Sequence, residues 1–210
     1  EAAGARAEER LVDEDLPARG SRKEAWTFVD APAPAHSGKK SRLQESAGLV
    51  QHYYDSDAGG PLAEAGDTLY GWIYLDPASP PRAVMLQYNT GDWKHRAYWG
   101  EKNLIEYAKT DKDEPVYRYM GPLPAAGQWV RLSADIGAVG IAPGLRIQGV
   151  AFSQYGGRAW WDDAGLLRVD PLDKLRRVAA LTPELRTPEQ TRSLQRAYRS
   201  KALPGFADLE

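Results

Sequence analysis

Residues 92–100, with the sequence DWKHRAYWG, bring together side chains that could recognise a ligand. The stretch contains three aromatic and three basic side chains within nine residues. Aromatic rings stack on the C–H faces of sugars, and basic side chains bind hydroxyl, carboxylate and sulfate groups. If these side chains are exposed, the stretch predicts a recognition surface for flat polar ligands, above all sugars.

The alternation of a β-strand would divide these side chains between two faces. We predict a strand over residues 93–99, whose faces carry Trp93, His95, Ala97 and Trp99 on one side, and Lys94, Arg96 and Tyr98 on the other. One set should therefore be buried, and the charge of Arg96 makes its face the better candidate for exposure. The guanidinium of Arg96 could bind a carboxylate or sulfate through two parallel hydrogen bonds.

A second aromatic surface is predicted on a strand over residues 67–75. Its faces alternate between aromatic and aliphatic side chains, with Tyr70, Trp72 and Tyr74 on one side, and Leu69, Ile73 and Leu75 on the other. The candidate ligand-binding residues of the chain are Trp72, Tyr74, Trp93, His95, Arg96, Tyr98 and Trp99. The alternative for each is burial, which is the commoner fate of aromatic side chains on strands. His95 could equally serve a buried carbonyl.

The elements that must position these residues are short β-type segments separated by Gly, Pro, Asp and Asn turns. The predicted strands are 25–30, 41–45, 48–54, 67–75, 83–89, 93–99, 116–119, 128–134, 146–153 and 159–169. About ten strands without intervening helices predict an all-β fold, a two-sheet antiparallel jelly-roll sandwich.

The pattern becomes helical after residue 170. Apolar residues recur at helical spacing over 172–179. Thr187 followed by Pro188 and Gln190 predicts a helix start, in which the threonine caps the helix and the glutamine reaches back to it in a capping box. The sandwich should therefore be followed by a short C-terminal helical extension.

Three parts are expected along the chain. Residues 1–22 are rich in Ala, Glu and Arg and lack apolar periodicity, so we predict a linker or disordered segment. Residues 23–170 form the β-sandwich module, and residues 171–210 form a helical extension or the start of a next domain. The absence of an initiator Met and of a signal peptide indicates a piece of a longer protein.

Composition limits the function classes. The formal net charge of −2 gives no bulk attraction to nucleic acid or to an anionic membrane, and no apolar run is long enough for a transmembrane segment. There is no Cys, so this segment holds no disulfide, thiolate zinc site, cysteine nucleophile or covalent c-type haem.

Several segments together resemble a β-sandwich module of planctomycete-type multidomain surface proteins that also carry a c-type cytochrome domain. The resembling segments are 36–39, 67–76, 80–81, 84–87, 93–100, 120–124, 127–132, 161–162 and 186–190. The resemblance covers most of residues 15–200, and it lies in the order and spacing of the motifs. It implies a module of an exported, periplasmic or cell-surface protein with neighbouring domains in the same chain.

A Ser-Gly-Lys loop that leads into a strand, and a late strand with the sequence Trp-Asp-Asp, are similar to jelly-roll carbohydrate-binding modules. In those modules a structural calcium commonly ties the first strand to the last. By this resemblance Asp162 would supply a carboxylate, Lys39 a backbone carbonyl, and an N-terminal acid such as Asp15 another oxygen. Asp162 and Asp163 point to opposite faces of a regular strand, so both could bind one ion only at a bulge. The alternative is that these acids are solvated turn residues.

Catalysis has weaker support. His95, Arg96, Tyr98 and Gln87 are the residue types that lyases combine, but their spacing does not match a lyase signature. A glycosidase needs two carboxylates across a cleft, and the acids of 111–114 form a loop of a kind that is usually solvated. We therefore predict no catalytic residue.

The predicted function is a non-catalytic carbohydrate-binding module for a polysaccharide, acidic if Arg96 takes part. Two alternatives stay open. One is a structural or protein-interaction spacer without glycan affinity, and the other is a polysaccharide lyase or hydrolase.

Overall fold

The computed structural model of the 210-residue chain describes residues 7–14, 21–23, 27–30, 34–56, 59–105 and 117–202. The chain divides into a compact unit, Ala7–Arg168, and a second unit that contains the segment from Val169 onward. Among the described residues, the first unit contains all the strands, and the second contains the two α-helices. None of the helices in the described part is long and apolar enough to cross a membrane.

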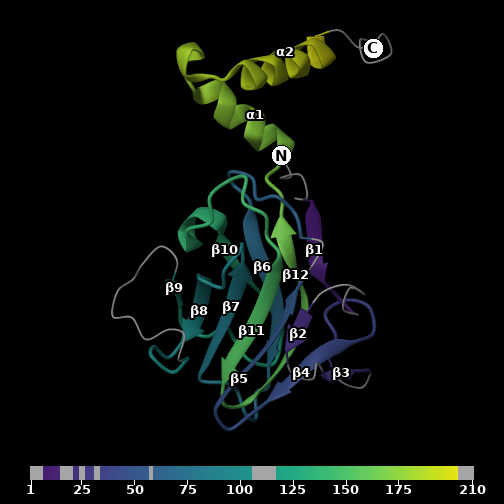
Figure 1. Ribbon diagram of the computed structural model, residues 1–210. Coiled ribbons are helices and arrows are strands. Elements are labelled where there is room, and N and C mark those ends of the chain that lie inside the picture. Colours follow the sequence, from purple (N-terminus) through teal and green to yellow (C-terminus); the bar gives the residue numbers. More distant parts are fainter. Residues whose placement is uncertain are drawn as a thin grey trace. The chain divides into compact units, whose positions relative to one another are not determined.

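The strands of the first unit form two sheets that face each other (Figure 1). One sheet has the order β10-β6-β12-β4-β3, with β1 also paired to β12. Its strands are β1 (Glu8–Val12), β3 (Thr27–Val29), β4 (Ser41–Glu45), β6 (Thr68–Leu75), β10 (Trp129–Asp135) and β12 (Arg158–Leu167).

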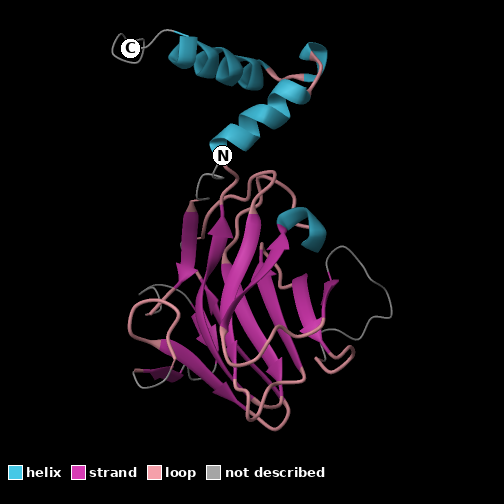
Figure 2. Cartoon of the chain, turned by 180° about the vertical axis from the view of Figure 1, so that it is seen from behind, coloured by secondary structure: helices cyan, strands magenta, loops and turns pink. Residues whose placement is uncertain are grey.

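The other sheet has the order β2-β5-β11-β7-β8-β9. Its strands are β2 (Ser21–Lys23), β5 (Leu49–Asp55), β7 (Ala83–Asn89), β8 (His95–Gly100), β9 (Tyr117–Gly121) and β11 (Gly149–Tyr155). All pairs in both sheets are antiparallel except β8 with β9, which run parallel. The predicted all-β two-sheet sandwich is confirmed (Figure 2).

The core lies between the sheets and is built by the alternation read from the sequence. On β6 the aliphatic face of Leu69, Ile73 and Leu75 is fully buried in this core. From the other sheet, Leu86 and Phe152 meet this face. Burial of this apolar area is the main favourable term in the stability of the fold.

The amino-terminal segment differs from the prediction. β1 occupies Glu8–Val12 and β2 occupies Ser21–Lys23, where the sequence predicted a linker or disordered segment. Val12 is buried in the core, while Glu9 pairs with Arg168 beside the sheet. Only one side chain of β1 is fully buried, so periodicity within the strand gives no signal. Its register comes from pairing with β12.

The second unit has two helices, α1 (Pro171–Ala180) and α2 (Pro188–Ala202), joined by a short 3-10 helix at Pro183–Leu185. The predicted capping box is confirmed. The Gln190 side chain accepts from the Thr187 N–H at 2.8 Å, and Thr187 Oγ1 accepts from the Gln190 N–H at 3.2 Å.

Protonation of the buried His52 should destabilise the sandwich. Burial first, and then the positive charge of Arg42, place the pKa of His52 well below its ordinary value. The unfolded chain therefore binds a proton near pH 6.5 that the folded chain does not. This His52 contribution to stability is present above that pH and is lost as the pH falls. We expect the free energy of unfolding to drop by about 1.4 kcal/mol more in the wild type than in His52→Gln between pH 7.5 and 5.5. Urea titrations at the two pH values measure the free energy of unfolding of both proteins. An equal drop in the wild type and in His52→Gln would contradict the prediction.

Candidate functional site

A shallow groove of about 210 Å³ lies on the outer face of the β2–β9 sheet. Its floor is a row of residues in register across four adjacent strands: Tyr53, Ala151, Gln87 and Arg96. Since inward-facing residues alternate with them along each strand, all four side chains point away from the core. The small side chain of Ala151 at the centre of the row leaves the hollow open.

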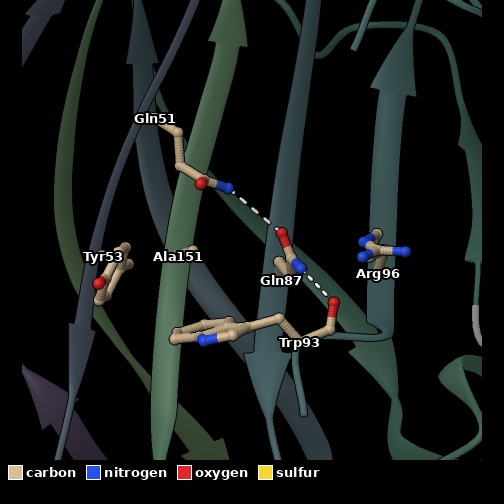
Figure 3. A pocket seen from close by; sticks show the side chains of 6 residues that line it. All are labelled: Gln51, Tyr53, Gln87, Trp93, Arg96 and Ala151. Carbon is tan, nitrogen blue, oxygen red and sulfur yellow. Dashed lines mark hydrogen bonds between the residues drawn. The ribbon is translucent and has the colours of Figure 1, made fainter. Parts of the chain in front are cut away.

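Trp93 closes one side of this groove (Figure 3). Its indole extends over β11, with its ring 5.2 Å from that of Tyr53 between centroids and tilted by 56°. Gly149 makes this position possible, because a Cβ there would lie only 3.0 Å from the Trp93 ring carbon Cη2.

The prediction of a strand starting at residue 93 was wrong at its first residues. β8 begins at His95, and Trp93 belongs to the turn that precedes it. Outside the strand, the side chain is freed from strict alternation and turns onto the same face as Arg96. The sequence had placed these two residues on opposite faces. The structure brings them together.

Hydrogen bonds fix the floor and the tryptophan. The Gln87 amide donates to the carbonyl oxygen of Trp93, and its own oxygen accepts from Gln51 Nε2 at 3.2 Å. Gln51 Nε2 also donates to Ser153 Oγ at 2.9 Å. Figure 3 shows this chain running across the sheet from Gln51 to Trp93. The direction of each amide is thereby set, which prepares the groove for a polar ligand.

His95 and Trp99 lie on the inward face of β8. His95 is 1% exposed, and its ring nitrogens lie 2.8 Å from the Val139 carbonyl oxygen and 2.9 Å from Thr90 Oγ1. This is the structural role that the sequence left open for this histidine. Trp99 is 8% exposed and packs in the core between the sheets. Neither ring offers a free face on the surface.

Tyr98 points outward but is covered. Its ring stacks on Tyr117 at 4.7 Å with an angle of 12° between the planes, and Ile105 packs in the same cluster. It therefore belongs to a second, smaller hydrophobic cluster and is not one of the residues that line the groove. Burial also raises the pKa of Tyr117, the largest cause being its removal from water.

Trp72 and Tyr74 lie half-buried on the outer face of the opposite sheet, while Tyr70, predicted on the same aromatic face, is fully buried. Trp129, Tyr74 and Trp160 form a row in register across β10, β6 and β12. Their rings meet edge to face at 5.9 and 5.7 Å, and the His36 ring lies on that of Trp72 at 3.7 Å. These rings pack mainly on one another, so the row offers no flat common plane to a sugar.

A cluster of three carboxylates lies where β12 leaves regular pairing. Asp13, Asp162 and Asp163 have carboxylate oxygens within 4.8 Å of one another. The register of β12 against β6 shifts between Trp161 and Ala164, and this irregularity turns the two adjacent aspartates toward the same place. The bulge that the sequence required for both acids to converge is therefore present.

Asp162 holds the loop at 36–39 in place. Its Oδ2 accepts from the backbone N–H of His36 at 2.7 Å and of Ser37 at 3.2 Å. Lys39 donates its own N–H to the carboxylate of Glu14, the acid from the N-terminal segment that the structure places here. Asp15 lies outside the described residues.

Asp162 and Asp163 are the two fully buried acids of the cluster. Burial first, and then a hydrogen bond with Asp13, raise the pKa of Asp163 to about 7, and the same bond lowers the pKa of Asp13. Oδ1 of Asp13 and Oδ1 of Asp163 are both buried, and no amide, hydroxyl or guanidinium of the described residues donates to them. Arg10 pairs with the other oxygen of Asp13 at 2.5 Å.

A larger hollow of about 500 Å³ lies within the helical unit. Leu175 and Val178 of α1 form its apolar part, and Gln190 and Ser193 of α2 lie on its polar side. It contains no aromatic ring and no converging hydrogen-bond network such as the one below Trp93. The groove on the sandwich is therefore the better candidate for recognising a sugar.

Gln51, Tyr53 and Gln87 complete the candidate site. Sequence reasoning missed Gln51 and Tyr53, and it named Gln87 only as a residue type that lyases combine. They are dispersed over two strands, and each is an ordinary outward-facing residue in its own segment. Only the pairing of β5 with β11, and of β11 with β7, brings them beside Trp93.

Comparison with known proteins adds structural neighbours. No protein-family model matches the sequence, and no curated protein matches it. A carbohydrate-binding module solved with β-1,4-galactotriose is 14% identical over 72% of this chain and 88% of its own, with a TM-score of 0.42. A xylan-binding domain from Paenibacillus barcinonensis is 12% identical over 80% of this chain and all of its own, with a TM-score of 0.40. An adhesin domain of Lys-gingipain from Porphyromonas gingivalis is 16% identical over 80% of this chain, with a TM-score of 0.43. These neighbours include carbohydrate-binding modules, and the likeness concerns the β-sandwich fold alone.

Proposed function

We propose that the sandwich is a non-catalytic carbohydrate-binding module that holds a sugar unit of a polysaccharide in the groove beside Trp93. One observation carries the proposal. The half-buried indole of Trp93, whose backbone carbonyl accepts from the Gln87 amide, closes one side of a groove that Ala151 leaves open and that Tyr53 and Arg96 also line. An aromatic face together with a few oriented polar groups is the usual composition of a sugar site.

The size of the groove fits one sugar ring better than an enclosed oligosaccharide. Its 210 Å³ is below the roughly 300–1,000 Å³ of pockets that enclose a drug-sized ligand. A polysaccharide would therefore lie across the face of the sheet, with one unit stacked on Trp93. This is consistent with recognition of a unit within a chain.

Arg96 extends the proposal to acidic sugars. Its guanidinium stands next to Gln87 in the same row of the sheet. A planar guanidinium binds carboxylate or sulfate oxygens in pairs, which a neutral hydroxyl cannot match. We therefore assign to Arg96 the preference for a uronate or sulfated unit.

The residues around the groove argue against a lyase or a hydrolase. The six lining residues include no carboxylate, so the pair of acids that glycoside hydrolysis needs is not at this place. His95, the base that a lyase would use, is buried and engaged through both ring nitrogens. The groove therefore lacks both the pair of carboxylates and the accessible histidine that these reactions use, which favours binding over catalysis.

A structural calcium at the carboxylate cluster is the second part of the proposal. Asp13 and Asp163 each have a buried oxygen that receives no donor from the described residues, and hard oxygens are the ligands that calcium takes. Such an ion would join the N-terminal segment to β12. The residues assigned are Asp13, Asp162 and Asp163, with Asp13 in the place that the sequence gave to Asp15.

A carbohydrate-binding module of this kind would belong to a larger exported or cell-surface protein and would attach that protein to polysaccharide. Membership of the planctomycete-type multidomain proteins, with a cytochrome domain elsewhere in the chain, stays a prediction.

Affinity electrophoresis tests the function. The chain should be retarded in gels that contain polygalacturonate or κ-carrageenan, and less so in gels with neutral hydroxyethylcellulose, because only the first two supply acid groups for Arg96. Arg96→Gln should reduce the difference between the acidic and neutral gels. No retardation in any gel, and none on a glycan array, would leave the spacer module as the function.

A further inference from the structure

The two units of the chain carry opposite charges. Residues 7–168 contain 18 Lys and Arg against 22 Asp and Glu. The second unit, residues 1–6 and 169–210, contains nine against seven, and within it residues 169–202 contain eight against four. The helical unit is thus basic within an acidic chain, which directs its electrostatic interactions toward anions.

Both helices of this unit are fixed at their ends. The guanidinium of Arg186 donates to the carbonyl oxygens of Val178, Ala179 and Leu181 at distances of 2.7–3.2 Å, which satisfies the free end of α1. The capping box at Thr187 fixes the start of α2. A helix held in this way presents its side chains in a defined geometry.

Three arginines form a row along α2. Arg192, Arg196 and Arg199 follow the i, i+4, i+7 spacing of one helix face, and all three are exposed. The row is about 10 Å long at 1.5 Å per residue. None of the three makes an ion pair or a side-chain hydrogen bond with the residues that the structure describes. Three adjacent like charges repel one another, so the row lowers the stability of the helix unless an anion neutralises it.

We propose that this arginine row (Arg192, Arg196 and Arg199) is a second binding surface for a linear polyanionic polysaccharide. The choice of ligand rests on the proposed function of the groove. A polymer with successive acidic sugars would place one anion after another along the row, while another sugar unit of the same polysaccharide occupies the groove. Two weak sites on one polymer raise the overall affinity through effective concentration.

A membrane surface is a poorer partner for the row. Interfacial helices need a broad apolar face rich in Trp, Phe or Leu opposite their basic face. Away from the row, α2 offers Leu194 and Ala197, which are half-buried, and a single exposed aromatic side chain, Tyr198. The row therefore provides charge without a broad apolar face to insert.

The test measures binding of the whole chain to κ-carrageenan and polygalacturonate over 50–300 mM salt. The triple variant Arg192→Gln, Arg196→Gln, Arg199→Gln keeps good helix formers in α2. We expect it to lose about 10- to 100-fold in affinity at 50 mM salt. The slope of log affinity against log salt should fall by about two to three, close to one per lost contact. Circular dichroism should show unchanged helix content.

A control variant with the same change in net charge removes three exposed cations of the sandwich, Arg82→Gln, Lys102→Gln and Arg118→Gln. It should lose less than threefold. Equal losses in the two triple variants, or no binding of polyanion by the wild type, would overturn the proposal. So would tighter binding of the wild type to 30% phosphatidylserine vesicles or to a 20-base-pair DNA duplex at the same salt.

The hypothesis about the groove and the hypothesis about the arginine row can be contradicted independently. If the row variant binds like the wild type while Trp93→Ala loses affinity, the inference about the row is wrong and the function of the groove stands. If the row variant loses affinity while Trp93→Ala does not, the row binds polyanions and the proposed function of the groove is wrong.

Discussion

Trp93→Ala should lower the affinity of the chain for its polysaccharide by about 30-fold, which corresponds to about 2 kcal/mol. The substitution removes the ring that covers the groove and leaves the floor in place. Its backbone carbonyl still accepts from Gln87, so the turn before β8 should keep its shape. Trp93 lies outside both hydrophobic clusters of the sandwich, and the variant should melt close to the wild type.

Trp72→Ala is the matched control, because Trp72 is also half-buried and lies on the outer face of the other sheet. It should leave the affinity unchanged within a factor of two. Isothermal titration with oligosaccharides released from a bound polysaccharide would measure both variants. Loss of binding in Trp72→Ala with retention in Trp93→Ala would move the site to the opposite sheet, to the row with Tyr74 and Trp160.

A substitution at Arg96 tests whether the groove recognises the shape of a sugar or its acid group. Arg96→Lys keeps a positive charge but loses the planar pair of donors, so it should weaken binding to acidic sugars while binding to neutral sugars persists. Trp93→Ala should weaken both. A uniform effect of Arg96→Lys on neutral and acidic ligands would show that the guanidinium supports the groove and does not read the acid group.

Strand alternation made much of the fold readable from the sequence. The segments 41–45 and 83–89 match β4 and β7, and the aliphatic face of β6 is the face that lies in the core. The capping box at Thr187 could be read because all its groups lie within four residues. Patterns that a segment carries within itself are therefore predictable.

The site was less predictable because it depends on pairing between distant strands. Tyr53, Gln87 and Arg96 are neighbours only through the register of β5, β11, β7 and β8. The division of 93–99 into two faces assumed that the strand starts at Trp93, whereas β8 starts two residues later, and a side chain before the strand does not follow its alternation. Trp93 and Arg96 were both selected from the sequence, but their common face was not.

The second large effect is expected from calcium. With calcium in about 100-fold excess over its dissociation constant, a single site stabilises the folded state by about 2.7 kcal/mol. For a chain of this size the melting temperature should then rise by about 5–10 °C relative to EDTA. Magnesium should produce a much smaller shift, because it needs a tighter octahedral shell and dehydrates reluctantly.

Asp163→Asn should abolish the response to calcium, because it replaces a buried carboxylate of the cluster by a neutral amide. Without calcium the variant should be as stable as the wild type or more so, since an amide carries no charge that burial penalises.

Asp76→Asn is the control. Asp76 is a buried acid that accepts from the backbone of Ala78 and pairs with Arg158, away from the cluster. Its loss should lower the melting temperature and leave the calcium shift intact. An unchanged calcium shift in Asp163→Asn would place the ion elsewhere, and no shift in the wild type would mean that Arg10 and Arg42 already supply the positive charge that these three aspartates need.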